Sequence, residues 1–368
     1  MTRVLGRVLA SAITEVRVVG MYPADYPAPD YEEDNGVRVW RLRKPGREWG
    51  GIRSRYAIYR QAAEWARMGE IDIIEAPDYD GWTAGWPELP VPVVVRLHGS
   101  SCYFQVEMGN PVRPSSYHIE RAALRRADWW CSVSQYTADR TRELFELPAP
   151  PRAILHNLVE PIDGEHAPVG ERVLFSGTLV LKKGVVPLFH SWPAVRSRRP
   201  KAELHLYGKD GRTGLGGSMK EHLLSLLPES DRGSVFFHGH VGRDELYQAI
   251  CQARVAVFPS YAEAFAIAPL EAMTTGCPTI YSTRGSGPEL LEHGRQGLLV
   301  NPDAPVEISD AIVSVLSDEE YARRLGQAGR ERVATHFSRP ALLGKNIEFY
   351  QDCIDRFGAR RGARARAA

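Results

Sequence analysis

Short runs of β-branched and aromatic residues alternate along the chain with longer segments whose apolar residues recur at helical spacing. In the first half, the pattern predicts strands at 15–20, 37–42, 71–76, 91–99 and 129–134. In the second half, it predicts strands at 172–177, 202–208, 234–240, 253–260 and 277–282. Amphipathic helices are predicted at 56–69, 116–127, 184–197, 243–253 and 305–317. Near-continuous apolar strands separated by helices indicate α/β structure, with parallel sheets covered on both faces.

The two series of strands are joined by a segment at 147–171 that is rich in proline and acidic residues and has one short strand-like run at 153–155. We interpret this segment as a linker between two Rossmann-like, doubly wound domains that face each other across a cleft. The predicted domains cover 1–160 and 161–337, followed by a helix at 338–357 and a tail at 358–368. The tail is basic and is predicted to be disordered.

Composition narrows the classes of function. The chain is 43% hydrophobic and 25% charged, which is typical of a soluble globular protein, and its formal net charge of +1 argues against bulk binding of nucleic acid. The five cysteines are widely spaced, so a disulfide framework or zinc site is not expected and a reducing compartment fits. Neither a signal peptide nor a membrane-spanning run is recognisable. We expect a cytoplasmic protein, with peripheral attachment to the inner face of the membrane as the alternative.

The segment 261–278, YAEAFAIAPLEAMTTGCP, places seven residues between Glu263 and Glu271. A helix is predicted to begin around Pro269, because proline suits the first helical position. The free amides at such a helix start form an anion site that suits a diphosphate. The amides in question belong to Ile267, Ala268 and Leu270.

The two glutamates fit the two ends of a sugar nucleotide. Glu271, in the first helical turn, can accept hydrogen bonds from a ribose diol, and Glu263, on the preceding loop, can reach sugar hydroxyls beyond the diphosphate. The alternative is that Glu271 is simply a favourable acidic residue in the first turn of a core helix. The segment therefore indicates a sugar-nucleotide site, with a core helix as the competing interpretation.

The segment EAFAIAPLEAMTTGCP resembles the E-x7-E motif of retaining glycosyltransferases of the GT-B fold, in family 4. Further segments resemble this family in the same order: LHG (97–99), SVSQYTADRTRELF (132–145), ILHN (154–157), FSGTLVLKKG (175–184) and GSGPELLEHGRQGLLVNP (285–302). The resemblance covers about residues 15–337 and is most specific over 172–302. It implies an acceptor-side domain at 1–160, a nucleotide-sugar-binding domain at 161–337 and a helix at 338–357 that crosses back to the first domain.

The resemblance also implies roles for single residues. Lys183 would neutralise the donor diphosphate, His98 would meet the primary hydroxyl of the donor sugar, and Glu263 would hold the 3- and 4-hydroxyls. These three residues form the predicted catalytic set. The predicted donor-binding set is Gly177, Thr178, Lys182, Lys183, Phe265, Ala266, Ile267, Ala268, Leu270 and Glu271. The donor would be a UDP- or GDP-linked sugar, and neither a metal nor another cofactor is implied.

Two residues are predicted on the acceptor side. Asp78 begins an Asp-Tyr-Asp sequence after a predicted strand, where it lines the acceptor side of the cleft or makes a turn. Tyr103 can stack on an acceptor sugar, with packing as the alternative. The basic stretch 38–47, with Arg53, Arg55 and Arg60, can contact anionic lipid, although most such charges form solvated faces.

The expected function is transfer of a sugar, with retention, from a nucleotide donor to a hydroxyl acceptor in polysaccharide, glycolipid or metabolite synthesis. The chain departs from the family pattern in two places. Thr178 stands where the family usually has arginine, with Lys182 as a candidate substitute, and no counterpart of the family's first strand is recognisable before the predicted strand at 15–20. The alternatives are therefore a non-catalytic or degenerate sugar-nucleotide-binding protein and an epimerase of the GT-B fold.

Overall fold

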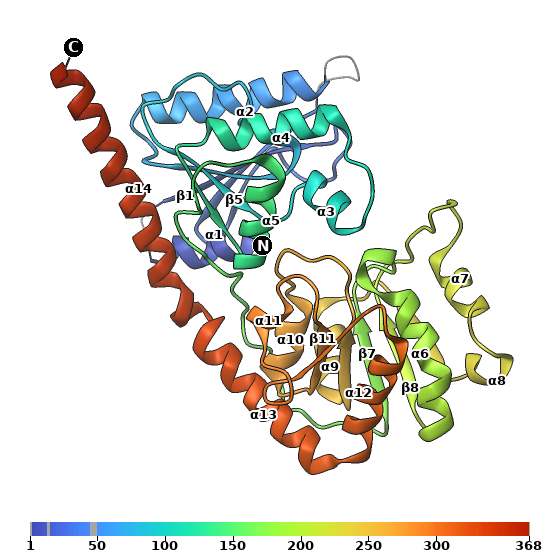
Figure 1. Ribbon diagram of the computed structural model, residues 1–368. Helices are drawn as coiled ribbons and strands as arrows, with labels where there is room; N and C mark the ends of the chain where they lie inside the picture. Colours follow the sequence, from blue (N-terminus) through green and yellow to red (C-terminus); the bar gives the residue numbers. More distant parts are fainter. Residues whose placement is uncertain (1, 13–14, 45–49, 368) are drawn as a thin grey trace. The chain divides into compact units, whose positions relative to one another are not determined.

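The computed structural model describes residues 2–12, 15–44 and 50–367 and divides into two compact units (Figure 1). Unit 1 comprises Met1–Leu158 and Arg339–Ala368, and unit 2 comprises Val159–Ser338. The divisions therefore fall at 158/159 and 338/339, compared with the predicted 160/161 and 337/338. Every predicted strand is present, and both units are built from strands and helices in alternation, so the predicted α/β fold class is confirmed.

The strands of unit 1 form two three-stranded sheets. In the first, β4 (Ile74–Pro77), β5 (Val93–Leu97) and β6 (Trp129–Ser132) are parallel, with β5 in the middle. In the second, β1 (Val16–Tyr22) pairs in parallel with β3 (Val37–Arg43), and β2 (Tyr31–Asp34) pairs with β3 in the antiparallel direction. Strand β2 was not predicted, although Asn35-Gly36 is a strong hairpin signal and both residues have positive φ angles.

The helical elements of unit 1 are α1 (Thr2–Ala10), α2 (Gly50–Arg67), η1 (Tyr79–Gly81), α3 (Ser101–Glu107), α4 (Pro114–Arg126), α5 (Gln135–Phe145) and α14 (Arg339–Ala367). The spacing of apolar residues along α2 determines which face of this helix is buried. Ile58, Ala62 and Ala63 lie on one face of this helix and form a buried cluster with Val93 of β5. Val19 of β1 packs against the same cluster, so α2 contributes to a core shared by both sheets.

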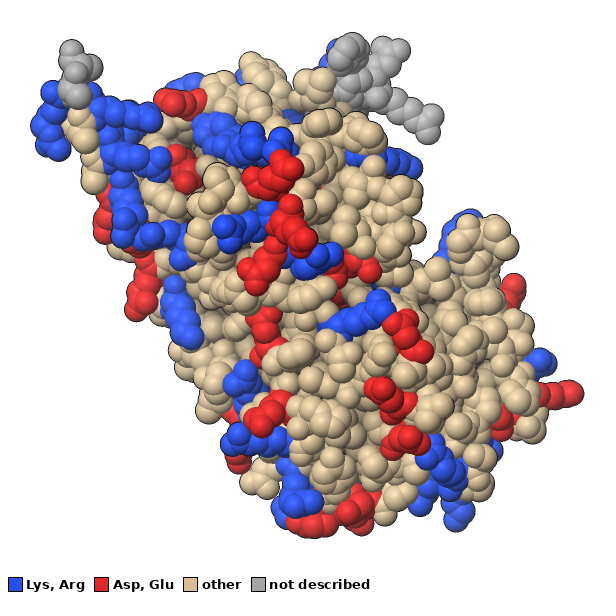
Figure 2. All heavy atoms as spheres, viewed as in Figure 1, with Lys and Arg blue, Asp and Glu red and all other residues tan. Residues whose placement is uncertain are grey.

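The prediction of a disordered basic tail at 358–368 is wrong for the residues that the structure describes, because 358–367 continue α14. Alanine and arginine favour the helix, and arginines of this segment have partners in the rest of unit 1. The guanidinium of Arg360 lies 4.5 Å from the ring centre of Trp129, and Arg361 donates a hydrogen bond of 2.8 Å to the carbonyl of Pro90. Figure 2 shows the basic side chains gathered along this end of the helix.

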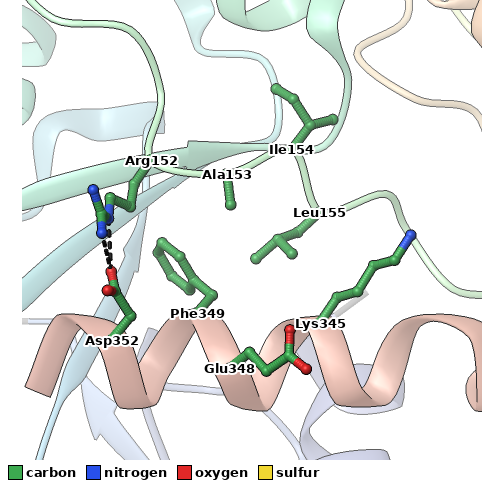
Figure 3. Close-up of a pocket in the computed structure, with 8 residues that line it drawn as sticks. All are labelled: Arg152, Ala153, Ile154, Leu155, Lys345, Glu348, Phe349 and Asp352. Carbon is green, nitrogen blue, oxygen red and sulfur yellow. Dashed lines mark hydrogen bonds and ion pairs between the residues drawn. The ribbon is translucent and has the colours of Figure 1, made fainter.

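A buried polar cluster attaches α14 to the parallel sheet of unit 1. The guanidinium of Arg96, on β5, donates to the carboxylate of Glu75 at 3.0 Å, to the amide oxygen of Asn346 at 2.9 Å and to the hydroxyl of Tyr350 at 3.0 Å. Arg96 is only 2% exposed. Next to this cluster, a surface groove runs between residues 152–155 and α14, and Arg152 pairs with Asp352 across it (Figure 3).

We expect Arg96→Met to lower the free energy of unfolding by about 3 kcal/mol, because it leaves polar partners of the guanidinium in a buried site without their donor. Urea denaturation followed by circular dichroism measures this loss. Tyr350→Phe, which removes a single hydroxyl from the same cluster, serves as the control and should cost about 1 kcal/mol. An Arg96→Met protein as stable as the wild type would show that the cluster does not stabilise unit 1.

Unit 2 contains one six-stranded sheet in which all neighbouring strands are parallel. Its strands are β7 (Arg172–Ser176), β8 (Glu203–Tyr207), β9 (Val235–Gly239), β10 (Val255–Phe258), β11 (Thr279–Ser282) and β12 (Leu298–Val300), in the order β12-β11-β10-β7-β8-β9. Strands β8 and β9 follow β7 on one side of the sheet, and β11 and β12 follow β10 on the other. The switch point of this doubly wound sheet therefore lies between β7 and β10, where ligands of such folds bind at the carboxyl ends of the strands.

The helical elements of unit 2 are η2 (Leu181–Lys183), α6 (Val185–Arg198), α7 (Met219–Ser225), α8 (Glu229–Arg232), α9 (Arg243–Gln252), α10 (Ala268–Thr275), α11 (Gly287–Leu290), α12 (Pro305–Ser317) and α13 (Glu319–His336). Helices α6 and α12 pack against each other, α9 packs against β7, and α10 packs against β10 and β11. Large apolar side chains of α6, among them Phe189 and Trp192, are fully buried. In the described part of both units, no helix is long and apolar enough to cross a membrane.

Candidate functional site

Two loops meet at the switch point of unit 2. One follows β7 and contains Gly177 and the short helix η2, and the other follows β10 and leads to α10. Their backbones are joined directly, because the carbonyl of Lys182 accepts hydrogen bonds from the amide of Tyr261 at 2.8 Å and from the amide of Ala262 at 3.4 Å. Gly177, which has a φ of +147°, turns the chain out of β7. Backbone pairing therefore positions the residues that follow on both loops.

Gly184 makes this close approach of the two loops possible. It has a φ of +70°, and a Cβ atom at this position would lie 1.7 Å from the carbonyl oxygen of Pro259. Only glycine has neither the side chain that would clash nor the steric penalty for a left-handed conformation. The glycine that the sequence places directly after Lys183 is thus needed for the packing of the site.

The ammonium of Lys183 forms an ion pair with the carboxylate of Glu263, so the structure brings two of the three predicted catalytic residues together. Their side chains are 26% and 12% exposed, which leaves both within reach of a ligand. Lys182 is half-buried, and its pKa is lowered mainly by burial. Thr178 is exposed on the loop after β7.

The start of α10 offers backbone amides. The helix begins at Ala268, one residue before the predicted start, so that Pro269 is its second residue. The amide of Glu271 donates to the carbonyl of Ile267 at 2.8 Å. The amides of Ala268 and Leu270 lie in the first turn, so no carbonyl within the helix can accept a hydrogen bond from them. Such amides can bind an anion. The side chain of Leu270 is fully buried, so this residue can offer a ligand only its backbone.

Two further members of the predicted donor-binding set lie in the loop before α10. The ring of Phe265 packs against Phe337 with 5.5 Å between their centres, and Phe265 is 4% exposed. Ala266 is also buried, with 6% exposure. Both residues can therefore present only main-chain groups to a ligand.

Glu271 lies beside two residues that the sequence analysis did not single out. The hydroxyl of Tyr247 donates to Glu271 at 3.4 Å, and the guanidinium of Arg243 donates to the same hydroxyl. Burial raises the pKa of Glu271, against the opposing effect of the positive charge of Arg243. Tyr247 and Arg243 belong to no motif. Their one signal in the sequence is their position on the helix that follows the carboxyl end of β9.

His98 follows β5 in unit 1, and its backbone is held by a carboxylate. The amides of His98 and Gly99 donate to the two carboxylate oxygens of Asp78 at 2.9 and 3.1 Å. Burial lowers the pKa of the His98 imidazole to about 4, helped by the charge of Arg96. At neutral pH the ring is therefore uncharged, with one nitrogen able to donate a hydrogen bond and the other able to accept one.

The two residues predicted on the acceptor side are buried in unit 1. Asp78 is 0% exposed, and burial raises its pKa to about 7. Tyr103 is 1% exposed, and its hydroxyl accepts a hydrogen bond of 3.4 Å from Thr137. Neither side chain is presented at the surface of unit 1 in this conformation. Their acceptor-side role stays a prediction. Within residues 2–12, 15–44 and 50–367, no group of three or more His, Cys, Asp or Glu side chains that could hold a metal ion is found.

Comparison with known families matches both halves of the chain. The family described as Glycosyl transferases group 1 matches residues 164–332, and the family described as Glycosyl transferase 4-like domain matches residues 1–157. The first match includes all the predicted donor-binding residues of unit 2, and the second includes His98 and Asp78.

Similar proteins of known sequence extend over most of the chain. An uncharacterized glycosyltransferase of Methanocaldococcus jannaschii is 22% identical over 92% of this chain and 91% of its own length. The GDP-mannose-dependent alpha-(1-6)-phosphatidylinositol monomannoside mannosyltransferase of Mycobacterium tuberculosis is 28% identical over 69% of this chain and 70% of its own length. The glycogen synthase of the same organism is 24% identical over 98% of this chain and 90% of its own length.

Solved structures agree on the fold. The sucrose-phosphate synthase of Thermosynechococcus elongatus superposes with a TM-score of 0.79 at 24% identity, covering 96% of this chain and 93% of its own. HepE from Anabaena, in a crystal structure with UDP and glucose, gives a TM-score of 0.69 at 14% identity, covering 92% of this chain and 100% of its own. These likenesses support a two-domain, Rossmann-like GT-B fold for this chain.

Proposed function

We propose that this chain, whose two halves match the families described as Glycosyl transferases group 1 and Glycosyl transferase 4-like domain, is a glycosyltransferase that moves a sugar from a nucleoside diphosphate to a hydroxyl acceptor with retention of the anomeric configuration. The observation that carries this proposal is the pairing of Lys183 with Glu263 on the two loops at the switch point of the unit 2 sheet, one of which leads to α10. A cation, a carboxylate and free helix amides match the diphosphate and the hydroxyls of a sugar nucleotide.

In the proposed complex, the ammonium of Lys183 and the amides of Ala268 and Leu270 bind the diphosphate, and Glu271 binds the ribose. Lys183 exchanges its pairing with Glu263 for the diphosphate, and Glu263 then accepts hydrogen bonds from the sugar hydroxyls. The neutral imidazole of His98 meets the primary hydroxyl of the donor sugar. Because burial lowers the pKa of His98, its ring is neutral at pH 7 and can both donate a hydrogen bond to that hydroxyl and accept one.

The proposed reaction requires one bond exchange at the anomeric carbon. The acceptor oxygen attacks on the face from which the diphosphate leaves, and the bond between the anomeric carbon and the diphosphate oxygen breaks. An oxygen of the leaving diphosphate takes the proton of the acceptor hydroxyl. The protein contributes by orienting both reactants and by stabilising the charge that develops on the diphosphate, which is the role assigned to Lys183 and the helix amides.

The proposal includes a UDP- or GDP-linked donor and an acceptor in polysaccharide, glycolipid or metabolite synthesis, in the cytoplasm. One relative acts with GDP-mannose by its name, and one structural neighbour was crystallised with UDP. Peripheral membrane contact has weaker support. In the basic stretch, Arg38 pairs with Glu15 at 2.7 Å and Arg43 with Asp30 at 2.6 Å, while residues 45–47 lie outside the described part of the chain.

Calorimetric titration with UDP-glucose, UDP-N-acetylglucosamine, GDP-mannose and ADP-glucose tests the donor site directly. We expect one of these donors to bind and to release its nucleoside diphosphate in the presence of sugar alcohols or glycan acceptors. NMR of the product should show the anomeric configuration of the donor. Absence of binding at millimolar concentration would exclude the proposal, and an inverted product would exclude retention. Binding without turnover would indicate a degenerate enzyme, and an epimerised donor formed without acceptor would indicate an epimerase.

A further inference from the structure

The segment that joins β5 to α3, residues 98–102, is held by two buried carboxylates. Asp78 accepts hydrogen bonds from the first two amides of the segment, those of His98 and Gly99. Glu120, on α4, accepts hydrogen bonds of 3.1 Å from the amides of Ser101 and Cys102. Four of the five amides in the segment are thus bound by side chains that come from elsewhere in unit 1.

This arrangement exceeds what the start of a helix requires. Ser100 already caps α3, because its hydroxyl accepts a hydrogen bond of 3.2 Å from the amide of Tyr103. Asp78 and Glu120 are 0% and 2% exposed, and burial of a carboxylate is costly even when it is hydrogen-bonded. The two acids also repel each other, since the charge of Glu120 contributes to the raised pKa of Asp78. The cost of burying Asp78 at this loop suggests that the exact path of the backbone at His98 and Gly99 matters for function.

The register of the sheet explains how Asp78 reaches His98. Strands β4 and β5 are parallel with Pro77 opposite Arg96, so Asp78 follows β4 just where β5 ends. The turn after Asp78 is also fixed in place. A Cβ atom on Gly81 would lie 2.8 Å from the carbonyl oxygen of Ile119, which shows how closely this turn packs against α4.

A second contact fixes the same turn from α2. The guanidinium of Arg55 donates to the carbonyls of Asp80 and Gly81 at 2.7 and 3.0 Å. Asp78 is therefore a rigid support rather than a mobile side chain.

We infer that Asp78 is a positioning residue, which fixes the backbone of His98 and Gly99 and thereby sets the place and orientation of the His98 imidazole. This inference rests on the proposed function, in which the imidazole meets the donor sugar. It gives Asp78 a role different from the acceptor-side role suggested by the sequence. A misplacement of about 1 Å in a reacting geometry costs on the order of 100-fold in rate, so loss of this support should affect turnover.

The test compares Asp78→Asn with Glu120→Gln. Each variant replaces a buried carboxylate that binds two successive amides, but only Asp78 holds the backbone of His98. We expect Asp78→Asn to lower kcat for donor hydrolysis or transfer by roughly 10- to 100-fold, while KM for the donor and Kd for the free nucleoside diphosphate change by less than about threefold. Glu120→Gln should keep kcat within about threefold of the wild type. Urea denaturation of both variants shows whether their losses of stability are comparable.

A second readout does not depend on activity. In protein labelled with ¹⁵N-histidine, the imidazole resonances of His98, assigned with His98→Gln, should shift in Asp78→Asn and stay in place in Glu120→Gln. An unchanged kcat in Asp78→Asn, or an equal loss of kcat in both variants, would overturn the inference. If the wild type turns over no donor, the proposed function fails, and the imidazole resonances alone then decide whether Asp78 positions His98.

Discussion

Lys183→Ala is expected to lower kcat/KM for the sugar-nucleotide donor by roughly 100- to 1000-fold, the size of effect seen when a group that stabilises charge in a transition state is removed. The variant removes the ammonium that we propose binds the diphosphate, together with its ion pair to the carboxylate of Glu263. Loss of this positive charge weakens both the binding of the diphosphate and the stabilisation of the charge that develops on it as it departs. Release of UDP or GDP, measured in a coupled assay, and calorimetric titration of the free nucleotide separate these two effects.

Two further lysine variants test whether the loss of activity comes from the ammonium of Lys183. Lys201→Ala is the matched control, because Lys201 is exposed and precedes β8 at the amino end of the strand, away from the carboxyl ends at the switch point. The activity of this variant should equal that of the wild type. Lys183→Arg retains the charge but not the compact ammonium, so we expect it to recover only part of the activity. Full activity in Lys183→Ala would mean that the diphosphate is bound elsewhere.

Gly184→Ala is expected to destabilise unit 2 by more than about 5 kcal/mol, which is a loss comparable with the whole stability of many domains. The new methyl group would lie 1.7 Å from the carbonyl oxygen of Pro259, and the residue would be forced to keep a φ of +70°. The backbone has to move, and this breaks the hydrogen bonds between Lys182 and the loop after β10. Urea denaturation and the yield of folded protein measure the loss.

Gly214→Ala is the matched control for this prediction. Gly214 lies in a loop of the same unit, and a Cβ atom there would have no neighbour within 4 Å. This variant should be as stable as the wild type and should bind nucleotides equally well. If Gly184→Ala were equally stable, the close packing of the two loops would not be what brings Lys183 to Glu263.

Several features of this protein follow from short-range patterns and were therefore predictable. The apolar runs identified buried strands such as β7 and β10, because residues that are buried on both faces must be apolar along the whole strand. Pro269 and the small residues around it marked the start of α10 to within one position. What escaped prediction depends on longer-range context. The short strand β12 has only three residues, too few to show a period. The helical end of α14 is held by contacts with Trp129 and Pro90, which are remote in the sequence.

The sequence alone determined the alternating α/β plan and the candidate residues of the donor site, because both depend on local periodicity and on motifs within a few residues. Only the tertiary structure decided which of these side chains meet. In the folded chain, Lys183 and Glu263 pair through loops that follow different strands, and Tyr247 contacts Glu271. Asp78 is buried and binds the backbone amide of His98. The physical reason is that sheet order and register, which no short segment encodes, decide which strand ends become neighbours.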